Sequence, residues 1–383
     1  MLDTSVYVHF PWCEKKCPYC DFATRKRAAV AIPHEAYADA VLRELALRGA
    51  MEGRRLASVF FGGGTPSLWA AEALGRVLAG IRGAFEAEVP ELEVTAECNP
   101  QSLTAEQARG FAAAGINRLS VGVQSLRDDQ LRFLGRLHDR EEALRALDDA
   151  CAAVPRVSAD LMFGMPKQRA MDAEIEAVLA TGVEHVSAYS LTIEPGTQFG
   201  ELHRLGRLEV APDDDVARLF QAAEARFAAG GFAHYEVSNY ARPGAEARHN
   251  QHYWRGGDYL ALGAAAVGCL GEGPGARRYR NVKDGDAYLE AVAQAQAATD
   301  VEGWQERLGP DERVQEALML GLRTTEGVNL AALGARIARD PLAGREAATT
   351  RALAAGDLVR EGDRLRVPRE RWLQLDGITA RLF

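Results

Sequence analysis

Three cysteines stand close together near the start of the chain, in the segment CEKKCPYC. Cys13, Cys17 and Cys20 follow one another at spacings of four and three residues. Thiolates select soft metal centres such as zinc or iron–sulfur clusters, and closed structural sites of either kind take four protein ligands. The other cysteines occur singly: Cys98, Cys151 and Cys269. With no fourth thiol nearby, the spacing predicts a metal centre with one open position, which is typical of catalysis or ligand binding.

Three other interpretations of this segment stay open. Zinc bound by the three thiols and the nearby His9 is one of them. The motif CPYC at residues 17–20 also matches the dithiol of glutaredoxin-like proteins, although it leaves Cys13 unexplained. A disulfide framework is the third, but it is typical of short secreted chains, and this chain has 383 residues.

The residues around the cysteines resemble the cluster loop of the radical S-adenosylmethionine (SAM) superfamily. The pattern CxxxCxxC follows the segment YVHFP at residues 7–11. In this form it is similar to the branch that contains oxygen-independent coproporphyrinogen III oxidase (HemN) and the heme chaperone HemW. The resemblance implies that Cys13, Cys17 and Cys20 bind three irons of a [4Fe–4S] cluster. The fourth iron would then chelate the amine and the carboxylate of SAM.

A glycine-rich turn, GGGTPS at residues 62–67, follows an apolar β-type run and precedes a helical pattern. Glycines at such a turn let a ligand approach the backbone closely, and a helix start suits an anionic group. Taken alone, this motif is more often only a turn. After a cysteine loop it resembles the GGGTP loop of the radical SAM family, which implies that Gly63, Gly64 and Thr65 hold the amino group of SAM.

Four polar residues lie in or after later apolar runs: Glu97, Gln124, Arg136 and Asp160. A charged group inside an apolar strand needs a partner, so each could be a satisfied buried group or a strand-end cap. An arginine fork suits a carboxylate. The resemblance implies that Arg136 lies near the SAM carboxylate and that the other three contact its ribose and methionine parts. It also implies three further SAM-contacting positions: Tyr7, Tyr19 and Ser190.

Histidines and aromatic residues gather again at residues 248–254, RHNQHYW, after a Pro-Gly turn. Imidazole is a ready iron ligand, and large aromatic side chains can cover a planar ring. A structural loop that packs Tyr253 and Trp254 is the plainer interpretation. The pattern HNxxYW nevertheless resembles a HemW-branch signature associated with heme binding, which implies His249 as heme ligand or close contact and His252 as the reserve. We expect this loop to lie at an accessible surface, with Asn250 orienting it.

The elements that must position these residues alternate along the chain. Apolar β-type runs occur at Ser5–Phe10, Ala57–Phe61, Leu92–Glu97, Arg118–Gln124, Ser158–Phe163 and His185–Ile193. Helical patterns lie between them, at residues 34–50, 68–84, 104–114, 139–153 and 170–181. This alternation predicts βα units around a parallel sheet, either an open doubly wound sheet or a barrel. The resemblance implies an α/β fold with a partial (β/α)6 radical SAM barrel, whose site lies at the C-terminal ends of the strands.

The last part of the chain has a different pattern. Helical stretches at 311–322 and 330–337 precede a hairpin pattern at 358–367, which predicts a C-terminal helical, winged-helix-like domain. We expect residues 1–235 to form the radical SAM partial barrel, 236–300 an extension carrying the HNxxYW segment, and 301–383 the C-terminal domain. The net charge of −9 argues against nucleic-acid binding, so we expect that domain to pack or to dock a partner.

The composition fits a cytosolic globular protein, with 47% hydrophobic residues. The first residues, MLDTSVYVHFPWC, carry neither a basic segment nor a long apolar run, so no secretory signal is predicted. The charge-free apolar stretch at 259–271 is too short to span a bilayer. We therefore expect a cytoplasmic protein without a transmembrane segment, associated with the membrane at most peripherally.

Two departures distinguish this chain from the coproporphyrinogen oxidases. Their pattern continues as CxxxCxxCxC, and here the fourth position is Phe22. They also carry a long N-terminal extension, whereas twelve residues precede Cys13. Together with HNxxYW, these features imply a HemW-type heme chaperone that binds SAM, a [4Fe–4S] cluster and heme, and delivers heme to acceptor hemoproteins such as membrane-bound respiratory proteins. A radical SAM enzyme acting on a porphyrin (coproporphyrinogen III decarboxylation or heme ring opening) and a SAM-binding protein without a heme role stay open.

Overall fold

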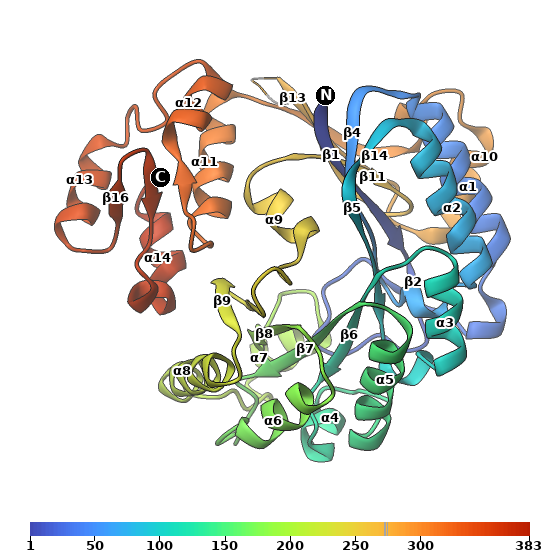
Figure 1. Cartoon of the computed structure of the whole chain (residues 1–383), viewed down its shortest axis with the longest axis horizontal. Coiled ribbons are helices and arrows are strands. Elements are labelled where there is room, and N and C mark those ends of the chain that lie inside the picture. Colours follow the sequence, from blue (N-terminus) through green and yellow to red (C-terminus); the bar gives the residue numbers. More distant parts are fainter. Residues whose placement is uncertain (272, 274) are drawn as a thin grey trace.

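Six parallel strands stand side by side in chain order in the computed structural model, which describes residues 1–383 apart from 272 and 274. They are β1 (Leu2–Phe10), β4 (Met51–Gly63), β5 (Phe85–Cys98), β6 (Arg118–Gln124), β7 (Arg156–Phe163) and β8 (His185–Ser190). Every residue of β6 is buried, as expected for a parallel strand that is covered on both faces. The curved sheet confirms the predicted partial barrel (Figure 1).

Helices connect successive strands and cover the outer face of this sheet (Figure 1). They are α1 (His34–Arg48), α2 (Ala71–Ala84), α3 (Ala105–Ala113), α4 (Asp128–Phe133), α5 (Arg140–Ala153) and α6 (Asp172–Ala180). Helix α5 begins with a capping box, because Asp139 and Glu142 each accept a hydrogen bond from the other's backbone N–H. The sequence pattern predicted all of these helices except α4, which has only six residues.

The sheet continues beyond the six expected strands at both edges. At one edge β11 (Asp258–Leu262) lies parallel to β1, and β12 (Val267–Leu270), β13 (Ala276–Asn281) and β14 (Glu302–Leu308) follow antiparallel. At the other edge β10 (Asn239–Ala241) pairs with β8 and with β9 (Ala233–Glu236). The sheet thus reaches Leu308, past the expected division at residue 300. The division of the chain into three parts stays a prediction.

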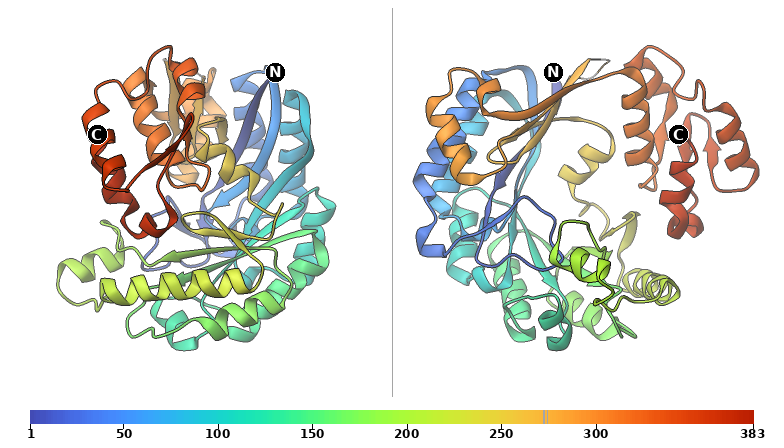
Figure 2. Two further views of the ribbon diagram at one scale, coloured as in Figure 1. Left: turned by 60° about the vertical axis from the view of Figure 1, so that its left-hand side comes forward. Right: turned by 180° about the vertical axis from the view of Figure 1, so that it is seen from behind.

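One short helix, α9 (Arg248–Trp254), lies on the concave face of the sheet, opposite to the outer helices (Figures 1 and 2). It packs against β4 and β11 on one side and against α11 (Pro310–Gly321) on the other. It therefore lies between the barrel and the C-terminal domain.

The C-terminal domain has a hydrophobic core of its own, which includes Val314, Leu365 and Trp372. Helices α11, α12 (Leu330–Ile337) and α13 (Glu346–Ala354) precede the hairpin of β16 (Val359–Glu361) and β17 (Arg364–Arg366), and β15 (Val328–Asn329) adds a third strand. This order confirms the predicted helical, winged-helix-like domain, seen beside the barrel in Figure 2. Across the described part of the chain, no helix is both long and apolar enough to cross a membrane.

Candidate functional site

A cavity of about 340 Å³ opens where the parallel strands end. It is lined by most of the predicted cofactor and metal residues: Cys13, Cys17, Tyr19, Cys20, Gly63, Gly64, Thr65, Glu97, Gln124, Arg136 and Asp160. Tyr7, Ser190 and His249 are not among the described residues of its lining. The structure therefore brings the cysteine loop, the glycine turn and the polar strand ends to one place, while their individual roles stay predictions.

The cysteine loop begins at β2 (Trp12–Cys13), where Cys13 is buried, and continues through the half-exposed Cys17 and Cys20. Burial raises the pKa of Cys13, and it raises the pKa of Cys20 to about 11. Binding a metal must therefore expel protons from these thiols. As placed, no three histidine, cysteine or acidic side chains among the described residues form a ready metal site. The donors nevertheless fit a cluster with an open position, because three thiols and the ligand-binding groups face one cavity.

A fourth thiol, Cys98, also lines this cavity. Burial raises the pKa of Cys98, and its Sγ lies 3.7 Å from the carbonyl oxygen of Ala96. In the sequence Cys98 is one of three cysteines that occur singly, and we expect none of the three to be needed for a cluster. Of those three cysteines, Cys98 is the informative one to replace, since the described lining of the cavity includes neither Cys151 nor Cys269.

The glycine turn is fixed against the cysteine loop. The backbone N–H of Gly64 donates to the carbonyl of Phe10 at 2.6 Å, and that of Thr65 donates to the carbonyl of Trp12 at 2.9 Å. Gly63 has φ of +107°, and a Cβ there would lie 2.5 Å from the His9 ring. A side chain at Gly63 would therefore be strained and would also clash, so the residue has to be glycine.

Two carboxyl groups share the inner wall of the cavity. Glu97 Oε2 accepts the N–H of Gly63 at 3.0 Å, and Asp160 Oδ1 accepts the hydroxyl of Ser120 at 3.2 Å. Burial, followed by the charge of Asp160, raises the pKa of Glu97 to about 8, and burial raises the pKa of Asp160 to about 6. A ligand that brings a positive charge and hydroxyl groups would stabilise both carboxylates, which suits the cationic SAM.

Arg136 lies beside the cysteine loop, with a terminal nitrogen 3.7 Å from Cys17 Sγ. Its other terminal nitrogen donates to Asn99 Oδ1 at 2.8 Å and to the carbonyl of Gly122 at 2.7 Å. Its Nε is buried and has no partner among the described residues. The guanidinium is thus held next to the expected cluster. Of its five N–H donors, the one on Nε and one on the nitrogen beside Cys17 are left for a carboxylate.

Sequence reasoning missed several residues that line the cavity. Two of its expected SAM contacts, Tyr7 and Ser190, are not in the described lining, and their roles stay predictions. Ser187 and Tyr189 of β8 line the cavity in place of Ser190. Alternate residues of a strand share a face, so this period-2 signal was present in the sequence. The Tyr189 hydroxyl donates to Gln124 Oε1 at 2.8 Å. Tyr7 is half-buried next to the cavity: its ring stacks on Phe60, a lining residue, with centroids 6.2 Å apart, and its hydroxyl lies 3.0 Å from His9 Nδ1. The remaining missed lining residues include Asn99, Arg118, Ser120 and Asn250.

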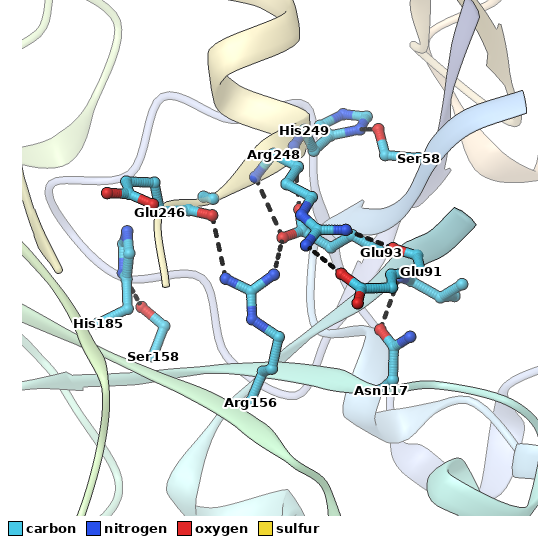
Figure 3. Close-up of polar contacts among 12 residues, drawn as sticks. Ser58, Glu91, Glu93, Asn117, Arg156, Ser158, His185, Glu246, Arg248 and His249 are labelled. Carbon is cyan, nitrogen blue, oxygen red and sulfur yellow. Dashed lines mark hydrogen bonds and ion pairs between the residues drawn. The ribbon is translucent and has the colours of Figure 1, made fainter. Parts of the chain in front are cut away.

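The HNxxYW segment is not an exposed loop, and that expectation is wrong. It forms α9, and His249 is only 3% exposed. Figure 3 shows the cause: the carboxylate of Glu93 accepts the backbone N–H groups of Arg248 at 3.1 Å and His249 at 2.9 Å, and it also accepts a hydrogen bond from Arg156 at 2.7 Å. This anion satisfies the free amides at the start of the helix and holds α9 in the barrel.

The His249 ring is enclosed on every side that the structure describes. Its Nδ1 lies 2.8 Å from Ser58 Oγ, and the ring stacks on Phe60 with centroids 4.9 Å apart. Burial lowers its pKa well below the ordinary value, so the imidazole is neutral. Its Nε2 is buried without a partner among the described residues. The nitrogen is chemically free to bind iron, but a heme reaches it only if α9 moves.

The other residues of the motif point to different surroundings. Asn250 lines the strand-end cavity. His252 Nε2 lies 2.7 Å from the carbonyl oxygen of Asp258, so this nitrogen donates and is not available as a ligand. Trp254 lines a separate cavity between α9 and the C-terminal domain. The helix therefore connects the barrel interior to the domain junction.

Comparisons with known proteins match this arrangement. A family model described as the radical SAM superfamily matches residues 7–179, and one described as the HemN C-terminal domain matches residues 308–373. The heme chaperone HemW of Mycobacterium tuberculosis (strain H37Rv) is 38% identical over 384 residues, which cover 99% of this chain and 94% of that protein. The chain belongs to the HemW family of the radical SAM superfamily.

Other members and a solved structure extend this relationship. Heme chaperone HemW of Bacillus subtilis (strain 168) is 34% identical and covers 85% of this chain and 84% of its own. The mitochondrial radical S-adenosyl methionine domain-containing protein 1 of Mus musculus is 38% identical, over 85% of this chain and 74% of its own. The solved structure of coproporphyrinogen III oxidase (HemN) from Escherichia coli superposes with a TM-score of 0.80 at 20% identity, over 100% of this chain and 90% of that one. This likeness confirms the fold of both domains in the HemW-family chain.

Proposed function

We propose that this HemW-family chain is a heme chaperone. It binds SAM and a [4Fe–4S] cluster in the strand-end cavity, binds heme, and passes the heme to acceptor hemoproteins, among them membrane-bound respiratory proteins served from the cytoplasm. The observation that supports it is the arrangement of the cavity. Its lining combines the three thiols of the cysteine loop with the SAM-type polar groups, and α9 of the HNxxYW motif reaches it through Asn250.

Different residues of the cavity would bind the cluster and SAM. Cys13, Cys17 and Cys20 would hold the cluster, which supplies one-electron chemistry and an iron that can chelate SAM when it is bound. Glu97 and Asp160 would bind the positive and hydroxyl groups of SAM. Their burial beside each other makes an incoming cation more strongly bound than at an exposed pair of carboxylates.

The arginine and its neighbours would orient the SAM carboxylate. Arg136 would bind it through the N–H donors that have no hydrogen-bond partner, while Asn99 and Gly122 keep the guanidinium in place. Tyr189 and Gln124 support one another across the cavity and complete its wall.

For heme we propose His249 as the iron ligand in a state in which the first turn of α9 has opened. Its Nε2 has no partner among the described residues, and its position is the one that the family signature implies. His252 stays the reserve, because its Nε2 donates to the carbonyl of Asp258 and only its Nδ1 could bind iron. Opening costs the bonds that Glu93 makes to the helix start. A ligand that is available only in an opened state suits a carrier, because closing the helix would expel the heme toward an acceptor.

Heme titration and transfer test this function. The full chain is purified anaerobically with its cluster, heme binding is followed by optical spectra, and transfer to an apo-hemoprotein is timed for the wild type, His249→Ala and His252→Ala. We expect transfer by the wild type and by His252→Ala, and loss of the iron-ligand spectrum in His249→Ala. Full binding by His249→Ala would refute this ligand, and a wild type that neither binds nor transfers heme would refute the function.

The same preparation distinguishes a chaperone from a porphyrin-modifying enzyme. Phe22 takes the place of the oxidase's fourth cysteine, and its ring lies at the cavity, 59% exposed. A phenyl ring offers neither a thiol nor a proton-transfer group. We therefore expect no protoporphyrinogen IX from coproporphyrinogen III with SAM and reductant present. Detection of that product would establish the enzyme instead.

A further inference from the structure

A second large cavity, of about 270 Å³, lies between α9 and the C-terminal domain. Trp254, the last residue of α9, forms one side of it. The facing side consists mainly of small and apolar residues of α11, β15 and α12: Ala317, Gly321, Val328, Ala332 and Leu333. A smaller cavity of about 150 Å³ shares Trp254 with it. The indole of Trp254 is therefore bordered by open space at the domain junction.

Trp254 is not held there by hydrogen bonding. Its indole N–H is buried and has no partner among the described residues. The guanidinium of Arg323 lies 5.9 Å from the centre of its ring. An aromatic face beside a cavity, with a positive charge near it, is a suitable platform for another flat aromatic system.

The rim of this cavity carries excess positive charge. Arg255 pairs with Glu326 at 2.7 Å, and Arg364 approaches the same carboxylate at 3.9 Å. Two guanidinium groups thus share one carboxylate, within a chain whose net charge is −9. A third arginine of the lining, Arg336, donates to the carbonyl of Gly256 at 2.6 Å. The rim can therefore bind an additional carboxylate without displacing Glu326.

We propose that this interdomain pocket, and not the strand-end cavity, receives the cargo as an iron porphyrin. The ring lies against Trp254 and the apolar wall, and its carboxylates pair with Arg255 and Arg364. A small anion would gain nothing from the apolar wall, and an uncharged apolar ligand would gain nothing from the arginines. The chemistry therefore selects a flat apolar ring that bears carboxylates. This inference depends on the proposed heme-chaperone function and adds to it the place where heme is first bound.

The size of the pocket agrees with cargo that must leave again. Pockets that bury a drug-sized ligand almost completely measure about 300–1,000 Å³. A pocket of about 270 Å³ encloses one part of a porphyrin and leaves the rest at the surface, open to an acceptor. His249 and Trp254 lie at opposite ends of α9. Binding at the Trp254 end accordingly requires no movement of the enclosed His249 ring.

Titrations of the full chain with three probes test the pocket: heme, metal-free protoporphyrin IX and its dimethyl ester. The variants are Trp254→Leu and Arg364→Glu, and their matched controls are Trp304→Leu on β14 and Arg351→Glu on α13. We expect heme affinity to fall about tenfold in Trp254→Leu. Because the Arg364 side chain is 46% exposed, we expect a fall of about threefold to tenfold in Arg364→Glu. The controls should bind as the wild type does.

The probes separate ring and carboxylate recognition from iron ligation. Protoporphyrin IX should bind the wild type nearly as well as heme, and the dimethyl ester more weakly. Wild-type heme affinity in both Trp254→Leu and Arg364→Glu would overturn the assignment of this pocket while the chaperone function stands. Failure of metal-free protoporphyrin IX to bind the wild type would do the same. Arg364→Glu changes a surface side chain, so it decides the question even if Trp254→Leu does not fold. A wild type that binds no heme would overturn the function itself.

Discussion

Replacing Arg136 by alanine removes the only guanidinium of the described residues that touches the cysteine loop within the strand-end cavity. The bond it is expected to make with the SAM carboxylate is charge-assisted, and such bonds contribute about 1.5–3 kcal/mol. SAM affinity should therefore fall roughly ten- to a hundredfold. Because Asn99 Oδ1 and the Gly122 carbonyl lose their donor, the free energy of unfolding should also fall, by about 1–3 kcal/mol.

Equilibrium binding of SAM to the reconstituted protein measures the first effect, and urea unfolding without SAM measures the second. Arg132→Ala, an exposed arginine on α4, is the matched control and should change neither. Arg136→Lys keeps the charge but loses the fork, so it should restore only part of the affinity. Unchanged SAM affinity in Arg136→Ala, with the cluster still present, would refute the assignment of this residue to the carboxylate.

Three further predictions use other parts of the site. The folded state holds the Glu97 proton up to about pH 8, so the free energy of unfolding of the wild type should fall as pH rises from the unfolded pKa of Glu97 through that value. In urea unfolding, Glu97→Gln should have the same free energy of unfolding as the wild type at pH 4 and a larger one above pH 6. The difference should grow by at most about 1.4 kcal/mol per pH unit. Cys17→Ala should abolish the iron signal after anaerobic reconstitution and Cys151→Ala should keep it, whereas the reverse result would contradict the cluster loop. His249→Ala should lower the free energy of unfolding by about 2–4 kcal/mol because it empties an enclosed, hydrogen-bonded site, and an unchanged melting curve would mean that α9 is not held as described.

Much of the fold could be predicted from the sequence because it rests on local patterns. Apolar runs that are buried on both faces, as in β6, alternate with amphipathic helices, and these signals need only neighbouring residues. Strand β11, on which β12 to β14 build the edge of the sheet, escaped prediction because it pairs with a distant segment. Tyr259 pairs with Ser5, for example, and nothing local to either residue reveals it.

The same distinction between local patterns and contacts of distant segments applies to the candidate site. The cysteine loop (Cys13, Cys17 and Cys20) and the GGGTP turn are continuous segments, so the sequence alone determined these two parts of the cavity wall. It did not reveal lining residues such as Ser187 and Tyr189, which distant strands bring to the cavity. The place of His249 was decided by the tertiary structure alone. Glu93, which lies 156 residues away along the chain, accepts its N–H and holds α9 inside the barrel. A buried carboxylate binds whichever amides the fold brings to it, and that meeting depends on long-range packing that no local pattern records.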